Sequence, residues 1–156
     1  MSESSRRSSA ARVINAAPAQ VYAAWVDPEL LISWLPPGDM TGKIHAFDAR
    51  IGGGYQMSLY YPGGDASQCG KTSEHEDVVH VRFVDLQPAR RIVQAVTFDS
   101  PDPSFAGEMT MTISFDLLGS GTRVSLDFRD LPPGLRPEDN DAGARISLDQ
   151  LARLFP

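Results

Sequence analysis

The chain has little cysteine and little basic charge, and each shortage excludes a class of protein. Cys69 is the only cysteine among 156 residues. The chain therefore forms no internal disulfide, and no zinc site built from several thiolates. Fourteen Lys and Arg side chains stand against 20 Asp and Glu, which gives a formal net charge of −6 at pH 7. An acidic chain does not attract a phosphate backbone at long range, so we expect no nucleic-acid partner.

Long apolar runs are also missing. Because a helix needs about 18 or more apolar residues to cross a bilayer, we expect no membrane span. Two arginines near the start are followed by no apolar segment, which argues against a secretory signal. We expect residues 1–10 to form a short disordered arm and residues 11–156 to form a single domain. The lone cysteine and the missing signal favour a reducing cytoplasm.

The rest of the chain has the composition of one globular domain, with 42% hydrophobic and 22% charged residues. A short strand is expected over 11–16. Two short helices are expected over 18–35, joined at Asp27, because Pro18 and Pro28 suit first helical positions. After them the apolar residues alternate with polar ones, which predicts about five or six antiparallel strands.

The clearest patterns lie in the last third of the chain. Apolar residues alternate over 109–117 and again over 122–128, on either side of a glycine-rich turn, and predict an antiparallel hairpin. From Asp141 to Phe155 the apolar residues recur at helical spacing. A sheet with one apolar face buries it against such a helix. The predicted fold class is therefore α+β, with a curved antiparallel sheet of six or seven strands wrapped around a long C-terminal helix.

Three features superficially resemble sites of chemistry. His75 and His80 lie five positions apart, whereas a zinc-protease pair needs a separation of four on a helix. On a strand an odd separation turns the two rings to opposite faces, so no metal site is predicted. Cys69 has no fixed base beside it and is interpreted as an incidental loop thiol. Glycines 52–54 precede a strand and no lysine follows them, so they predict a bend in the sheet, not a phosphate loop.

His80 and Arg82 share one face of a predicted strand. If that face is inward, the two side chains anchor a carboxylate or carbonyl inside an apolar cavity. If it is outward, they are ordinary solvated residues. Val79, Val81 and Phe83 better fit the buried set, so the pattern favours the outward orientation.

Aromatic and methionine side chains gather on the strands that should face the last helix. Each alone is best interpreted as core packing, but together they suit an adaptable apolar pocket. No pair of carboxylates falls on the sheet face that meets the last helix. The sequence therefore indicates no residues for acid–base catalysis by paired carboxylates. The candidate ligand-binding residues are Trp34, Tyr55, Met57, Leu59, His80, Arg82, Phe98, Met109, Met111, Phe115, Ala144 and Leu148.

Several local strings carry a resemblance to a known family. They are Pro18–Tyr22 with Trp25, Asp27–Leu30, Trp34, Arg50–Gly53, Pro88–Val93, and Gly143 with Leu148–Ala152. In order and spacing they resemble the START-like (SRPBCC, helix-grip) superfamily. Within it they are most similar to bacterial proteins that match the C-terminal domain of the activator of the Hsp90 chaperone ATPase. The likeness covers nearly the whole chain after the first ten residues.

Two positions depart from the family pattern. Ala144 stands where the family usually has Trp, and Asp127–Arg129 stands where it often has His. A small residue between helix and sheet leaves unfilled volume. Either Met109 and Met111 collapse into that volume, or it enlarges a pocket.

The resemblance implies a helix-grip domain that binds a small apolar or amphipathic ligand between the sheet and the C-terminal helix, with no cofactor and no identified chemistry. It also implies two alternatives. One is a stress-response role as an activator of a chaperone ATPase through protein contact. The other is an enzyme of the cyclase or hydrolase kind, for which His80, Arg82 and Tyr55 are the candidate polar residues. A chaperone and a second copy of the chain stay open as partners.

Overall fold

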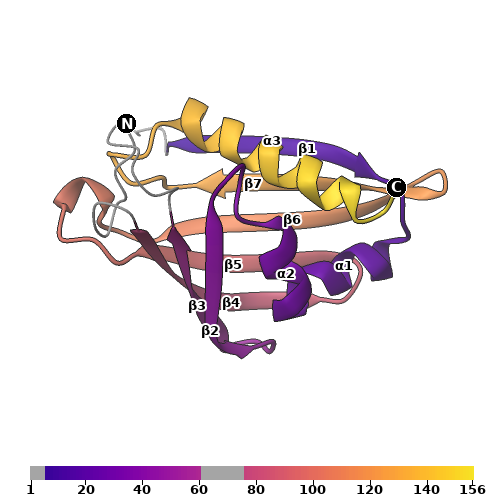
Figure 1. Cartoon of the computed structure of the whole chain (residues 1–156), viewed down its shortest axis with the longest axis horizontal. Coiled ribbons are helices and arrows are strands. Elements are labelled where there is room, and N and C mark those ends of the chain that lie inside the picture. Colours follow the sequence, from indigo (N-terminus) through magenta and orange to yellow (C-terminus); the bar gives the residue numbers. More distant parts are fainter. Residues whose placement is uncertain (1–5, 61–75) are drawn as a thin grey trace.

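The structure is a computed structural model that describes residues 6–60 and 76–156. Within these residues seven strands form one antiparallel sheet in the order β1-β7-β6-β5-β4-β3-β2. The sheet curves around the helices that cover one of its faces (Figure 1). The strands are β1 (Arg7–Ile14), β2 (Thr41–Asp48), β3 (Gly54–Tyr60), β4 (Glu76–Gln87), β5 (Arg91–Phe98), β6 (Met109–Leu118) and β7 (Gly121–Arg129).

The helices confirm the predicted α+β helix-grip arrangement. The long helix α3 runs along β1 and also contacts α2, while α1 packs against β6 and β7 (Figure 1). A single core cluster joins the helices to the inner face of the sheet. The helices are α1 (Pro18–Val26), α2 (Pro28–Trp34), the short 3-10 turn η1 (Pro103–Phe105) and α3 (Pro137–Arg153).

The junction between the first two helices lies at Asp27, as predicted. Its Oδ1 accepts hydrogen bonds from the backbone N–H groups of Glu29 at 3.0 Å and of Leu30 at 3.4 Å. Pro28 occupies the first helical position, where a missing N–H leaves no bond unmade. The side chain of Asp27 therefore ends one helix and begins the next within a single residue.

The sheet begins earlier than expected, so the boundary of the N-terminal arm at residue 10 is wrong. Strand β1 starts at Arg7 and pairs with β7 from there on. The buried Ser8 exchanges hydrogen bonds with Asp141 and Asn140 of α3. This stretch is held by backbone pairing and polar side chains, and for that reason it shows no apolar periodicity. Residues 1–5 lie outside the described residues.

The bend predicted at glycines 52–54 is confirmed. The β2–β3 pairing shifts register between His45 and Asp48, opposite the start of β3. A Cβ on Gly54 would lie only 1.9 Å from the backbone oxygen of Val81 on β4. Only glycine allows the two strands to approach this closely.

The C-terminal helix also begins earlier than predicted, at Pro137 instead of Asp141. Proline suits the first helical position, and Glu138 and Asp139 in the first turn interact favourably with the positive end of the helix dipole. The extra turn is polar, so the apolar stripe alone did not indicate it.

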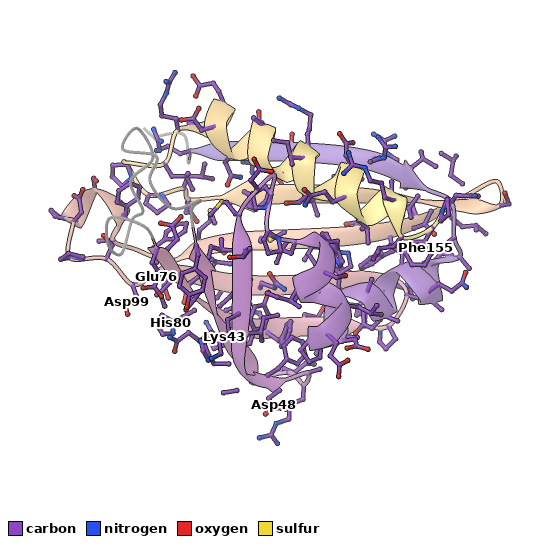
Figure 2. All side chains as sticks on the ribbon, viewed as in Figure 1. Lys43, Asp48, Glu76, His80, Asp99 and Phe155 are labelled. Carbon is purple, nitrogen blue, oxygen red and sulfur yellow. The ribbon has the colours of Figure 1, made fainter. Side chains whose placement is uncertain are left out.

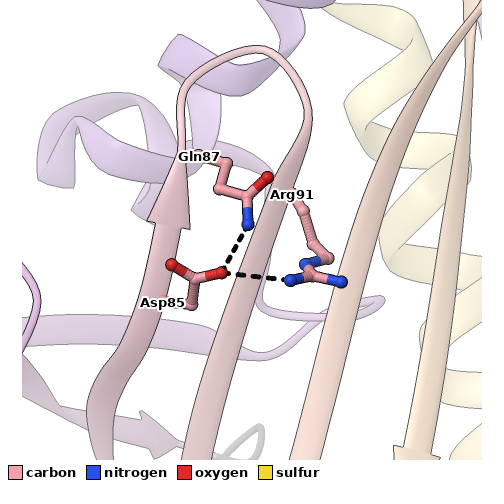
Figure 3. A network of polar contacts seen from close by, with 3 residues as sticks. All are labelled: Asp85, Gln87 and Arg91. Carbon is pink, nitrogen blue, oxygen red and sulfur yellow. Dashed lines mark hydrogen bonds and ion pairs between the residues drawn. The ribbon is translucent and has the colours of Figure 1, made fainter.

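The β4–β5 turn holds a small polar network on the outside of the protein (Figure 3). Gln87 Nε2 donates a hydrogen bond to Asp85 Oδ2 at 2.7 Å, and Arg91 Nη2 donates to the same oxygen at 3.2 Å. These two bonds lower the pKa of Asp85, because they favour its charged form.

Candidate ligand-binding cavity

A cavity of about 330 Å³ lies between the inner face of the sheet and helix α3, and it is partly open to solvent. Strands β3 to β7 form its floor, and α3 and the segment after α2 form its roof and wall. The volume lies near the lower end of the range of roughly 300–1,000 Å³ found for small-molecule sites. Its lining is Trp25, Leu35, Pro37, Met40, Tyr55, Met57, Leu59, Asp77, Val79, Val81, Gln94, Val96, Phe98, Met109, Met111, Leu126, Phe128, Leu135, Asp139, Asn140, Gly143, Ala144 and Ser147.

More than half of the residues predicted from the pattern line this cavity. They are Tyr55, Met57, Leu59, Phe98, Met109, Met111 and Ala144. The two alternatives for the volume beside Ala144 are thereby decided in the structure. The methionines leave the space open, so the small residue enlarges a pocket.

Three predicted residues belong to the packed core and do not line the cavity. Phe115 lies farther along β6 and contacts the ring of Tyr22 on α1, with ring centroids 5.6 Å apart. Leu148 is fully buried one helical turn after Ala144. Trp34 packs edge-on against Trp25 at 4.6 Å. Periodicity places such residues on the inner face but does not tell which part of that face is covered.

His80 and Arg82 point away from the cavity, which confirms the outward orientation that the pattern favoured and removes both from the candidate ligand contacts. The side chain of His80 is 48% exposed, and its Nε2 lies 3.9 Å from a carboxylate oxygen of Asp99 (Figure 2). That of Arg82 is 56% exposed, with its guanidinium 3.5 Å from the Glu108 carboxylate. Val79 and Val81 take the inner face of β4 instead. Of the three residues named for an enzyme, only Tyr55 lies in the cavity.

Tyr55 lines the cavity with an aromatic ring that carries a polar hydroxyl group. Its ring stacks on Phe47 with ring centroids 5.1 Å apart, and the side chain of Gln94 lies near its hydroxyl. Burial raises the pKa of the hydroxyl well above its ordinary value, while the nearby carboxamide of Gln94 lowers it by less. Tyr55 therefore stays protonated and neutral at physiological pH.

The polar lining residues were missed, although strand parity could have found two of them. Gln94 alternates with Val96 and Phe98 on β5, and Asp77 alternates with Val79 on β4. Both follow the inner-face parity of their strands. A pattern of apolar residues does not indicate them, because both side chains are polar.

Hydrogen bonds from two side chains of α3 hold the roof in place. Ser147 Oγ on α3 donates to the backbone oxygen of Leu35 at 2.7 Å. Gln150 Nε2 donates to the backbone oxygen of Trp34 at 2.6 Å, and its Oε1 accepts from the N–H of Gly38 at 3.0 Å. These bonds tie α3 to the segment after α2, and they keep the two walls of the cavity at a fixed separation.

Two hydrogen-bond donors in the cavity lining have no partner in the described part of the chain. They are the indole Nε1 of Trp25 and the carboxamide Nε2 of Gln94. The two residues are 1% and 2% exposed. The indole of Trp34 differs, because its Nε1 donates to the backbone oxygen of Ala24 at 3.0 Å. An unpaired buried donor costs about 1–3 kcal/mol, so such groups call for an explanation.

The other candidate sites have no counterpart in the described structure. His75 and Cys69 lie outside the described residues. Among the described residues no group of three or more His, Cys, Asp or Glu side chains is arranged to hold a metal ion. In the same part of the chain, no helix has the length and apolar character that crossing a membrane requires.

A comparison with known protein families shows which family this chain resembles. The family described as "Activator of Hsp90 ATPase homolog 1-like protein" matches residues 15–156. The chain belongs to this family. The family match and the structural neighbours confirm the START-like, SRPBCC resemblance. Among the curated proteins, none matches this sequence.

Solved structures agree over almost the full length of the chain. Protein CV1439 from Chromobacterium violaceum is 32% identical with a TM-score of 0.82, and the alignment covers 96% of this chain and 97% of that one. Mll3558 from Rhizobium loti is 24% identical with a TM-score of 0.73, covering 96% of each chain. A protein from Arthrobacter aurescens is 16% identical with a TM-score of 0.76, covering 96% and 85%. The last two show the fold alone.

Proposed function

We propose that this family member binds one small apolar or amphipathic molecule in the cavity between the sheet and α3. The supporting observation is the cavity itself, which is open to solvent, about 330 Å³ in volume and lined mainly by apolar side chains. A small domain with no use for such a space would gain stability by filling it. The cavity stays unfilled next to Gly143 and Ala144, which favours a role in ligand binding.

Hydrophobic burial supplies the driving force for binding. Each 100 Å² of apolar ligand surface removed from water contributes about 2.5 kcal/mol. Part of that gain is offset by the translational and rotational freedom that the ligand loses. Met57, Met109 and Met111 provide flexible thioether walls that adapt to different ligand shapes.

A matched pair of variants on α3 tests the proposal. Ala144→Trp places a large ring in the cavity, whereas Ala142→Trp places the same ring on the exposed face of the same helix. Binding is measured by displacement of an apolar fluorescent dye and by the ligand-induced rise in melting temperature. We expect the wild type and Ala142→Trp to bind and Ala144→Trp to lose binding. Equal binding by all three proteins, or no binding to an apolar ligand library, contradicts the proposal.

Family membership supports a second candidate, activation of a chaperone ATPase. The measurement is the ATPase rate of Hsp90 with and without added protein. A rise that Ala144→Trp retains would indicate an action through the exterior, and no rise would remove this candidate. The cytoplasmic location and a homodimer stay predictions, to be checked by cell fractionation and by sedimentation of the purified protein.

A further inference from the structure

The two unpartnered donors in the cavity indicate the chemistry of the guest. Trp25 Nε1 and Gln94 Nε2 are buried, lack partners in the described part of the chain, and belong to residues that line the same cavity. Most buried polar groups in proteins are hydrogen-bonded, and the exceptions require a reason. A ligand atom that accepts a hydrogen bond would supply the missing partner.

The direction of this hydrogen bond follows from the indole. An indole N–H can only donate, so the ligand atom facing Trp25 must be an acceptor. This holds whichever way round the Gln94 carboxamide lies. Ser147 and Asn140 of the roof already have partners, since Ser147 Oγ donates to the backbone oxygen of Leu35 and Asn140 Nδ2 donates to Ser8 Oγ at 2.9 Å. They place no further requirement on the ligand.

The charges of the described lining residues disfavour an ionised guest. Among these residues there is no Lys, Arg or His, and the two acidic ones are Asp77 and Asp139. Among the described lining residues a buried carboxylate would meet no cation and would stay unpaired. An ammonium group would bring only donors, so the indole of Trp25 would stay unpaired. A neutral acceptor satisfies both conditions.

We propose that the ligand is uncharged and carries a carbonyl oxygen of the ketone, ester or amide kind, which accepts hydrogen bonds from Trp25 and Gln94 while its apolar body fills the cavity. This inference rests on the proposed function, because it names the class of molecule that the same cavity takes. Neutral donors bind a carbonyl without the desolvation penalty of a buried charge.

Four ten-carbon probes separate the possibilities: decan-2-one, decane, decanoate and decylamine. Affinities are measured by displacement of the apolar dye. We expect the ketone to bind roughly tenfold more tightly than decane, since satisfying buried donors is worth about 1–2 kcal/mol. Decanoate and decylamine should bind more weakly than the ketone.

The outcomes distinguish this inference from the proposed function. If none of the four probes binds, the proposed function itself fails. If decane and decan-2-one bind equally well, the cavity binds ligands but the donors are satisfied by trapped water, and this inference is overturned. Tighter binding of decanoate or decylamine than of the ketone overturns it as well.

Variants link the preference to the two donors. Gln94→Met replaces the carboxamide by an apolar side chain of similar length, and Trp25→Phe replaces the indole by a smaller aromatic ring, so each removes one donor. Thr97→Val changes the opposite face of β5 as the control. We expect both donor variants to lower the affinity for the ketone several-fold while leaving that for decane unchanged, and Thr97→Val to alter neither. Thermal unfolding verifies that each variant folds.

The carbonyl stretch of bound, isotopically labelled decan-2-one gives a direct readout. A carbonyl that accepts a hydrogen bond absorbs at lower frequency than one in an apolar surrounding. We expect the low-frequency band in the wild type and a shift to higher frequency in Gln94→Met and Trp25→Phe. A band at the same frequency in all proteins contradicts the assignment of these two donors.

Discussion

The two halves of β6 have the same alternating pattern but different surroundings. Met109 and Met111 border the open cavity beneath Ala144. Farther along the strand, Ile113 and Phe115 lie in a filled core, and α1 packs against this strand. The pattern of apolar residues therefore reports which face is buried, and the placement of the helices decides whether that face is filled. The packed end of the core, at Ile113 and Phe115, contributes to stability. The end at Met109 and Met111 borders the cavity.

The packed end should respond most strongly to truncation. Ile113 is fully buried, so Ile113→Ala removes apolar contacts and leaves a void that the surroundings cannot fill. We expect the free energy of unfolding to fall by about 3–4 kcal/mol, measured by urea denaturation. A loss below about 1 kcal/mol would show that this end is not tightly packed.

The open end should tolerate the same kind of change better. Met111 already borders a space that solvent can enter, so Met111→Ala widens an existing cavity and creates no new one. We expect a loss of about 1–2 kcal/mol in the same assay, smaller than at Ile113. Equal losses at the two positions would remove the distinction between the two ends of β6.

Alkaline pH should also act on the open end, through Tyr55. Burial raises the pKa of its hydroxyl in the folded state, whereas in the unfolded chain tyrosine ionises near pH 10. Above that pH the unfolded state binds fewer protons, so the free energy of unfolding falls by up to about 1.4 kcal/mol per pH unit. Tyr55→Phe should flatten this decline in denaturation experiments between about pH 9.5 and 11. An unchanged slope would contradict the burial of the hydroxyl.

The smallest effect is expected at Asp85, outside both ends of the core. Its pKa is lowered by hydrogen bonds from Gln87 and Arg91, so its contribution to stability is present above the unfolded pKa. That contribution is lost as the pH falls through the lower, folded value. Because the side chain is partly exposed to solvent, which screens its interactions, Asp85→Asn should change the melting temperature only slightly at neutral pH and not at all at pH 2. A large loss at neutral pH would reveal a stronger network.

Much of the architecture could be predicted from local signals. The proline–aspartate junction of the two short helices, the alternating hairpin of β6 and β7, and the stripe of α3 each rest on neighbouring residues, and each is confirmed. The start of β1 and the first turn of α3 were missed, because polar contacts between Ser8 and Asp141 hold them together. Such contacts join residues far apart in the sequence and leave no periodic trace.

The candidate site was predictable only in part. Parity alone indicated that Tyr55 and Met111 face inward, and it also favoured the outward orientation of His80 and Arg82. It could not separate the cavity-lining Met111 from the packed Phe115, which has the same parity on the same strand. That difference depends on which helix lies above each residue.

The sequence by itself determined the elements, the apolar face of the sheet and the helix that covers it, because these follow from side-chain spacing within one segment. Only the tertiary structure decided that Trp34 finds a backbone acceptor while Trp25 finds none among the described residues, and that a space remains beside Ala144. Hydrogen-bond partners and voids are properties of several segments brought together. They become defined only when the separate elements pack against one another.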